Sequence, residues 1–493
     1  MNGQYLKTWD FAISTMSSGA LYVLPNPGDR RPSPAMAAPF NVSIVEHCRV
    51  SPPPDSTIPP ITLPLTFLDI PWLLYPPNQT LLFFPKPPPK TTITTVTTLL
   101  KQSLSLTLHH FHPLAGNLVS PPPPAEPYIV YTEGDSISLT LAESNTTINH
   151  LSGDHPRVIT NLYSLLPQLP IISMSRDTHV PLLAIQITIF TDSGYSIGVT
   201  AQHAAADERT LDQFLKCWAS VCISLLKKES LFVFNSTPWF DRRIILDPNL
   251  LKTRFLKQLW NPLNSTKDYS FEQTDHNIVR STFLLTSSDM NMIKQHILAK
   301  CKMINEDPPV HLSPYVSACS YIWICLLKVQ ETLELKDGPM YLGFNAGGIT
   351  RLGFEVPANY FGSCIAFGRC MVMKSVLLGE DAIVFAAKSL GKEIKRLDMD
   401  VLEGADRWIC DWEELNVRVL GSPKVDSYGL DFGWGKVQKV EKISSDAHGR
   451  VNVVSLCESR DLNGGMEIGM VLFREKMSAF TSIFNGGLME LAL

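Results

Sequence analysis

A histidine followed four residues later by an aspartate is the feature of this sequence that could do chemistry most directly: His203-Ala-Ala-Ala-Asp207. Histidine can accept a proton near neutral pH, so His203 could act as a general base. An aspartate at this spacing could orient the imidazole, as in a Ser-His-Asp triad. The competing interpretation is a structural histidine, with the three alanines packed tightly at a turn instead of leaving room for substrates.

The local pattern places His203 where a substrate could reach it. Residues 182–190 and 195–202 are rich in β-branched and apolar side chains and are separated by turn residues, so they predict a hairpin. Residues 211–226 have apolar side chains at helical spacing. His203 is therefore expected at a strand-to-helix turn, at the rim of a sheet.

A second histidine and aspartate occur at the same spacing, His150 and Asp154. About one such match is expected by chance among twelve histidines. The surrounding residues, ESNTTINHLSGDHPR, form a polar stretch with no strand leading into it. We interpret this second motif as accidental.

Two other groups could carry chemistry. His109, His110 and His112 are clustered, but their spacing matches no common zinc pattern, so no metal site is predicted. Cys364 could be a covalent nucleophile, yet Arg369 is the nearest basic residue in sequence, and a cysteine in apolar company is usually inert. Neither group is favoured over His203.

The string Asp431-Phe432-Gly433-Trp434-Gly435 is far less probable by chance. Its glycines permit a bend with an aromatic side chain wedged between them, which is also a purely structural interpretation. HxxxD followed by DFGWG resembles the BAHD acyl-CoA-dependent acyltransferases. The likeness also includes CRVSPPP from Cys48, LPLTFLDIPWLL from Leu63, NYFGSC from Asn359 and ESRDLNGGMEIG from Glu458, and it is most similar to the branch that acylates flavonoid and phenolic glycosides.

The resemblance implies roles for several residues. His203 would be the general base, and Asp207 would turn away from the substrates and pair with an arginine, here Arg351. Asp431 and Trp434 would brace the site, with the indole N–H near the thioester oxygen as an alternative. The supporting positions that the resemblance implies are Gly433, Gly435, Arg351, Asn359, Tyr360 and Gly362. The chain departs from the family pattern at Glu208, Gly347, Ile349 and Ser363.

Composition limits the classes of function. The 493 residues are 45% hydrophobic with a net charge of -5 and no basic stripe, which argues against nucleic acid or an anionic membrane surface as partner. Ten cysteines without a CxxC pair indicate free thiols in a reducing compartment. We expect a cytoplasmic monomer with no metal or bound cofactor, which uses malonyl-CoA or hydroxycinnamoyl-CoA as co-substrate and a small-molecule acceptor.

Strands and helices alternate through both halves of the chain, which predicts an α/β fold. The resemblance implies two similarly built mixed-sheet domains around a solvent channel, as in chloramphenicol acetyltransferase. The expected division is an extension over 1–35, a first domain over 36–230 plus 430–461, a crossing linker over 231–268, and a second domain over 269–429 plus 462–493. Helices are expected over 91–108, 288–302, 313–332, 375–397, 399–417 and from 474 onward, and strands over 41–50, 278–286, 340–346, 437–443, 451–459 and 466–473.

Overall fold

The computed structural model describes residues 40–493 apart from 55–56, 90, 171, 173–176, 192, 230–236, 261–276, 331–336, 422–424, 444–451, 462 and 493. The described residues belong to one compact unit, Phe40–Leu493. The predicted extension over 1–35 lies outside the described residues, as do parts of the predicted linker over 231–268. All of the described helices and strands belong to the unit Phe40–Leu493.

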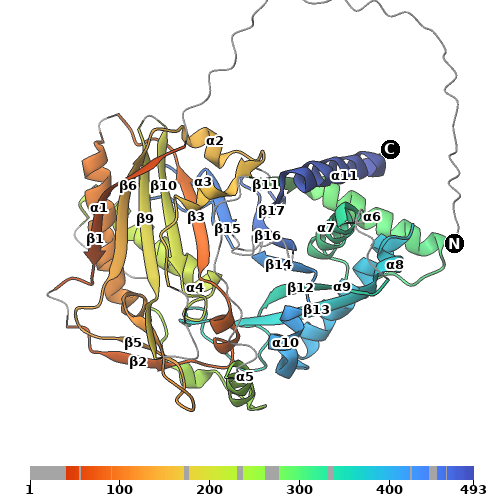
Figure 1. The fold of residues 1–493 in the computed structure, drawn as a ribbon, viewed down its shortest axis with the longest axis horizontal. Helices are drawn as coiled ribbons and strands as arrows, with labels where there is room; N and C mark the ends of the chain where they lie inside the picture. The colour runs from red at the N-terminus through yellow and green to blue at the C-terminus, as the bar shows by residue number, and fades with distance from the viewer. Residues whose placement is uncertain are drawn as a thin grey trace, which may run out of the picture. The chain divides into compact units, whose positions relative to one another are not determined.

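The first sheet carries the predicted hairpin (Figure 1). The strands β9 (Leu183–Phe190) and β10 (Gly194–Ala201) pair antiparallel at its centre. The other strands of this six-stranded sheet are β1 (Val42–Val50), β3 (Asn78–Phe84), β6 (Ile137–Ser144) and β15 (Lys439–Ile443), in the order β1-β6-β9-β10-β3-β15.

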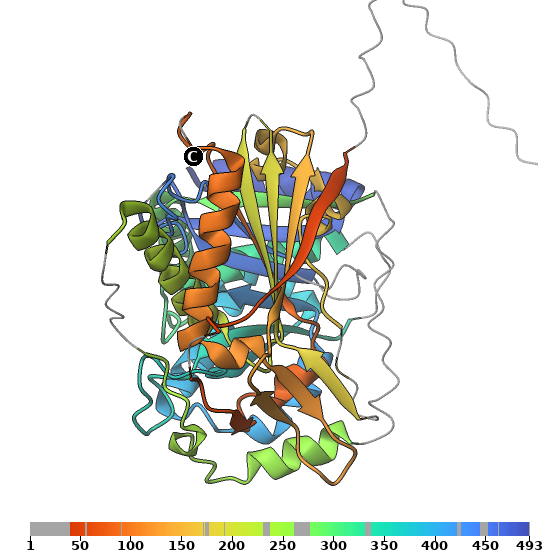
Figure 2. The same cartoon turned by 90° about the vertical axis from the view of Figure 1, so that its left-hand side faces the viewer.

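Both faces of the first sheet are covered, which explains why its central strands are apolar at almost every position. Alternate residues of β3 divide between two cores: Leu82 and Phe84 join the main core, whereas Leu81 and Phe83 pack with the residues of α2 (Ile148–Ser152) and α3 (Ile159–Tyr163). The main core also takes in α1 (Ile93–His110) and α4 (Glu208–Lys227), which contact each other. Figure 2 looks onto α1 and the strands of this sheet.

The second sheet is mixed and has seven strands in the order β13-β12-β14-β16-β17-β11-β7. Their bounds are β7 (Arg157–Val158), β11 (Ile278–Leu285), β12 (Pro339–Gly347), β13 (Ile365–Met373), β14 (Val417–Gly421), β16 (Asn452–Glu458) and β17 (Met466–Phe473). A smaller antiparallel sheet contains β2 (Ile61–Pro64), β4 (Asn117–Ser120), β5 (Tyr128–Tyr131) and β8 (Thr178–Pro181).

The remaining helices lie mainly in the second half of the chain. They are α5 (Leu251–Leu259), α6 (Ser287–Met303), α7 (Pro314–Gln330), α8 (Lys374–Leu377), α9 (Ala382–Met399), α10 (Trp408–Glu413) and α11 (Arg474–Ala492), with short 3-10 helices η1 (Ile70–Leu74), η2 (His112–Ala115), η3 (Arg242–Ile244) and η4 (Ala405–Arg407). Among the described residues, no helix has the length and apolar character needed to cross a membrane.

The predicted mixed α/β class is confirmed, but some predicted elements are wrong. The range 399–417, expected to be one helix, holds η4, α10 and the first residue of β14, and α5 lies within the expected linker. The expected first-domain range 430–461 contains β15, which pairs in the first sheet, and also β16, which pairs in the second. The division of the chain into domains, and the channel between them, stay predictions.

Candidate active site

His203 lies at the turn between β10 and α4, as the sequence predicts. The strand ends at Ala201, and Gln202 anchors the start of the turn by donating its backbone N–H to the Leu182 carbonyl at 2.8 Å. The three alanines that follow His203 are at most 2% exposed, so close packing at the turn is their role in this structure.

The His203 imidazole is buried but not sealed. Its residue is 9% exposed, and among the described residues its Nδ1 has no hydrogen-bond partner. Nε2 is the other ring nitrogen, and in the neutral imidazole one of the two can accept a proton. Burial lowers the pKa of His203 to about 4, while its own backbone carbonyl and the Asp207 carboxylate oppose that shift. The imidazole is therefore neutral at physiological pH, as a general base requires.

Asp207 braces the turn and does not orient the imidazole. Its Oδ1 accepts the backbone N–H of Thr210 at 2.8 Å, which caps α4, and its Oδ2 accepts the backbone N–H of Cys364 at 3.1 Å. Arg209 Nη2 lies 3.6 Å from Oδ1. The expected pair with Arg351 is wrong, because Arg351 instead pairs with Asp398 at 2.8 Å.

The segment from Asn359 to Cys364 is hydrogen-bonded to this turn. Ser363 donates its hydroxyl to the His203 carbonyl at 3.0 Å and its backbone N–H to Asp69 at 2.9 Å. Thr210 donates its hydroxyl to the carbonyl of Gly362 at 3.1 Å. Sequence reasoning places this segment near the site but misses Asp69, because no spacing connects residues so far apart in the chain.

A buried arginine completes the support for this segment. Arg242 Nη1 donates to Asp69 Oδ2 at 3.2 Å and to the Tyr360 hydroxyl at 3.0 Å. Gly362 has a φ of 145°, and a Cβ there would lie 2.1 Å from Arg242 Nη1. The glycine is thus required both by its backbone conformation and by the close guanidinium. Asn359 lies at the edge of the same contact, where its carbonyl accepts the N–H of Trp239 at 2.8 Å.

Cys364 is poorly suited to be a nucleophile. Its side chain is buried, and burial raises the pKa of its thiol to about 12. A thiol with this pKa stays protonated at neutral pH, and the thiolate is the reactive form. Its backbone N–H already serves the turn by binding Asp207.

The DFGWG segment lies away from His203. Asp431 Oδ1 accepts the backbone N–H groups of Gly433 at 2.7 Å and Gly435 at 3.0 Å, so the aspartate closes its own bend. Trp434 packs edge-on against Tyr195, with 6.3 Å between ring centroids. Tyr195 is near the start of β10, six residues before Ala201, which corresponds to about 20 Å of strand. This position favours bracing, the main expectation, over the alternative of an indole N–H near the reacting thioester, and the role of the segment stays a prediction.

Two glycines make this bend possible. Gly433 has a φ of 99° and Gly435 a φ of 121°, both in the region that favours glycine. A Cβ at Gly433 would lie 2.8 Å from Leu226 at the end of α4, and one at Gly435 would lie 2.7 Å from Pro85 after β3. The segment thus fixes α4 against the first sheet at the end remote from the His203 turn.

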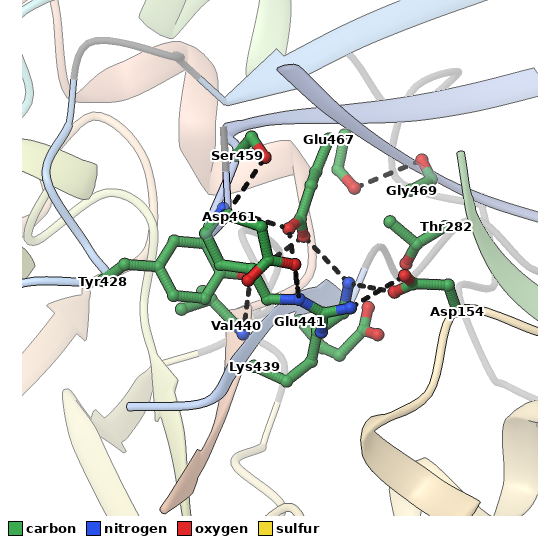
Figure 3. A network of polar contacts seen from close by, with 12 residues as sticks. Asp154, Thr282, Tyr428, Lys439, Val440, Glu441, Ser459, Asp461, Glu467 and Gly469 are labelled. Atoms are coloured by element: carbon green, nitrogen blue, oxygen red, sulfur yellow. Dashed lines mark hydrogen bonds and ion pairs between the residues drawn. The ribbon is translucent and has the colours of Figure 1, made fainter. Parts of the chain in front are cut away.

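The second HxxxD motif is structural. His150 is exposed on α2, and its Nδ1 lies 3.3 Å from Nε2 of His155. Asp154 pairs with Lys439 and Arg460, each at 2.8 Å, within a network of polar contacts (Figure 3). Its carboxylate therefore belongs to the framework of the fold. Over the whole described part of the chain, no three histidine, cysteine, aspartate or glutamate residues are placed to hold a metal ion.

Asp207→Asn is expected to lower stability more clearly than it lowers kcat. The amide can accept one of the two backbone N–H groups but would turn its own NH₂ toward the other, a loss of about 1–3 kcal/mol. Denaturant unfolding and steady-state kinetics measure the two effects. Asp212→Asn, which removes an i,i+4 pair with Lys216 on the same helix, is the control and should cost at most about 0.5 kcal/mol. Unchanged stability with a collapsed kcat would assign Asp207 a direct role in the reaction.

Comparison with known proteins identifies the family to which the chain belongs. Residues 40–486 match the model of the Transferase family. The malonyl-coenzyme A:anthocyanin 3-O-glucoside-6''-O-malonyltransferase of Dahlia pinnata is 37% identical over 469 residues, covering 91% of this chain and 98% of the relative. The coumaroyl-CoA:anthocyanidin 3-O-glucoside-6''-O-coumaroyltransferase 2 of Arabidopsis thaliana is 36% identical over 475 residues, covering 93% and 99%.

Solved structures show the same fold. Vinorine synthase aligns with a TM-score of 0.64 at 19% identity, covering 92% of this chain and 98% of that one. TRI101 of F. graminearum complexed with ethyl coenzyme A aligns with a TM-score of 0.59 at 16% identity, covering 85% and 96%. With a family model that spans nearly all of residues 40–493, and with relatives matched over almost their full length, the chain belongs to the Transferase family, the BAHD acyltransferases.

Proposed function

We propose that this protein is an acyl-CoA-dependent O-acyltransferase that moves a malonyl or aromatic acyl group to a hydroxyl of a phenolic or flavonoid glycoside. The single observation that carries the proposal is the His203 imidazole at the strand-to-helix turn, which burial keeps neutral by lowering its pKa to about 4. The names of the relatives supply the class of donor and acceptor. We also propose that the protein works as a cytoplasmic monomer on small molecules.

The reaction follows from one base and two substrates. Nε2 of His203 takes the proton of the acceptor hydroxyl while the oxygen attacks the thioester carbonyl carbon. The carbon–sulfur bond then breaks, and the CoA thiolate takes the proton back from the imidazolium. No acyl-enzyme is formed, so both substrates must be bound together and initial-rate plots should intersect.

A catalytically weak homologue that only binds a small ligand or a partner is the alternative. It is motivated by Glu208, by Ser363, and by Gly347 and Ile349 at two positions of an expected Asp-x-Arg-x-Arg pattern. The first two departures are accommodated in the structure. Glu208 pairs with Lys442 of β15 at 2.7 Å, and Ser363 holds the His203 carbonyl. The enzyme is therefore the better supported proposal.

The choice of donor gives a direct test. We expect release of free CoA from malonyl-CoA or coumaroyl-CoA in the presence of a flavonoid glucoside, and little release with the sugar-free flavonoid. Ile349 offers no cation to a malonyl carboxylate, which disfavours malonyl-CoA. A malonyltransferase and a coumaroyltransferase are both similar to this chain, so both donors have to be tested. A competition assay in which acetyl-CoA is preferred over both donors would place the chain in another branch, and no CoA release from any pair would favour the binding protein.

A further inference from the structure

The His203 imidazole is stacked on the indole of Trp72. The ring centroids are 3.6 Å apart, and the planes are inclined by only 7°. Trp72 is 3% exposed and belongs to η1, a helix of the first half of the chain that lies far from His203 in sequence. Two buried rings thus meet face to face at the point where the proposed base must work.

Trp72 is held in this position from several sides. Phe367 and Tyr75 lie against it, with ring centroids at 5.0 Å and 5.7 Å. Asp69, which precedes η1, accepts the N–H of Ser363, and Ser363 donates its hydroxyl to the His203 carbonyl. The same chain of hydrogen bonds therefore fixes both rings relative to each other.

A general base that accepts a proton becomes a cation, and here that cation is formed in a buried place. In a Ser-His-Asp triad a carboxylate on Nδ1 stabilises the imidazolium. Here the Asp207 oxygens accept N–H groups of Thr210 and Cys364 instead, and within the described residues Nδ1 of His203 has no hydrogen-bond partner. The backbone carbonyl of His203 and the Asp207 carboxylate favour the imidazolium, but burial outweighs them and lowers the pKa to about 4, so proton transfer would be helped by a further stabilising group.

We propose that Trp72 is a positioning residue that stabilises the His203 imidazolium through the π face of its indole and fixes the plane of the ring. A cation over the face of a tryptophan, within about 6 Å and shielded from water, is attracted by the ring quadrupole. The neutral ring gains less from the same contact, so the stabilisation grows as the proton is transferred. This inference rests on the proposed acyl transfer and assigns a role to Trp72, which lies within the stretch LPLTFLDIPWLL but is given no role by the resemblance.

The other groups near the imidazole, including the His203 carbonyl, supply only part of this stabilisation, because burial still lowers the pKa of His203. Asp207 acts on His203 through space, but its carboxylate is shared with two N–H groups and Arg209. Asp69 is paired with Arg242. Cys364 keeps its proton because burial raises its pKa to about 12. An experiment that changes only the indole face leaves all of these groups unchanged.

Fluorinated tryptophan provides that experiment, because fluorine weakens the π face and hardly alters the shape of the ring. The full chain would be produced with tryptophan that carries one, two or three fluorine atoms. We expect kcat to fall stepwise, by roughly 10- to 30-fold across the series, with the KM for acyl-CoA unchanged. The chain contains nine tryptophans, so Trp72→Phe produced with the same labels is the matched control and should show no stepwise trend. A flat series in the unsubstituted chain overturns the role of Trp72.

A second measurement needs no turnover. Ring-proton NMR of His203, assigned with His203→Gln, reports the pKa of the imidazole in the free protein. Each added fluorine should lower that pKa further, because the imidazolium loses stabilisation. A falling pKa in a chain without turnover would overturn the proposed function and support the stacking role, whereas normal turnover with an unchanged pKa would overturn the stacking role alone.

Discussion

Glu441→Gln will lower the free energy of unfolding by about 3–5 kcal/mol, the cost of removing one partner from a buried ion pair. Glu441 is fully buried on β15 of the first sheet. Its two carboxylate oxygens accept from Arg157 of β7 and Arg280 of β11, both in the second sheet and both at most 2% exposed. A neutral amide would leave two buried guanidinium groups without their counter-charge.

The surrounding charges show that this contact joins the two sheets. Lys439, also on β15, is fully buried and pairs with Glu467 of β17 and with Asp154, each at 2.8 Å (Figure 3). Tyr428 donates its hydroxyl to the Glu467 carboxylate at 2.8 Å. One strand of the first sheet thus presents both an acid and a base to partners of opposite charge in the second.

Denaturant unfolding at neutral pH measures this effect. Glu46→Gln, which breaks the exposed pair of Glu46 with Lys101 at 3.0 Å, is the control and should cost much less, because solvent screens this pair. If Glu441→Gln prevents folding altogether, Glu467→Gln should give a smaller loss, because Lys439 keeps its contact with Asp154. Equal losses for Glu441→Gln and Glu46→Gln would mean that the buried network does not stabilise the fold.

The pH dependence has a defined sign. Burial alone would raise the pKa of Glu441, but Arg157, Arg280 and Lys439 outweigh burial and hold it well below its usual range. A carboxylate whose pKa is lowered in the folded state stabilises the fold to its full extent at pH values above its unfolded pKa of about 4.3. The difference in the free energy of unfolding between the unsubstituted chain and Glu441→Gln should therefore become smaller as the pH falls below about 4.

The turn that carries His203 could be predicted from local sequence, because strand burial and helix capping, both of which depend on neighbouring residues, determine it. The apolar strands at 183–190 and 194–201 are buried on both faces, and Asp207 is a favourable N-cap residue for α4. The same reasoning separates His203 from His150, since only His203 follows a strand. Strand and helix periodicity likewise locates β11, β17 and α11 within about one residue.

The rest of the site depends on contacts between distant segments. Trp72, Asp69 and Arg242 carry no spacing signal that connects them to His203, so sequence reasoning misses them. The resemblance assigns Arg351 to Asp207, but Arg209, two residues beyond Asp207, lies nearer to it in the structure. The resemblance leaves Trp434 near the thioester as an alternative to bracing, but a specific motif gives no distance, and Trp434 packs against Tyr195 at the far end of β10.

The central claim is that His203 is the base and that the second HxxxD motif has no part in the reaction. His203→Ala should lower kcat by about 10²–10⁴-fold, the usual contribution of general-base catalysis, while the affinity for acyl-CoA stays unchanged. His150→Ala is the matched control, because the histidine has the same spacing to an aspartate but is exposed on α2. Its kcat should equal that of the unsubstituted enzyme.

The decisive measurement is the release of free CoA in the presence of a saturating acceptor glycoside. It is made side by side for the unsubstituted enzyme, His203→Ala and His150→Ala. We expect that only His203→Ala loses turnover, and that intact-protein mass spectrometry finds no acyl group on the enzyme during the reaction. Full activity in His203→Ala, or an acyl adduct on Cys364 or Ser363, would contradict it.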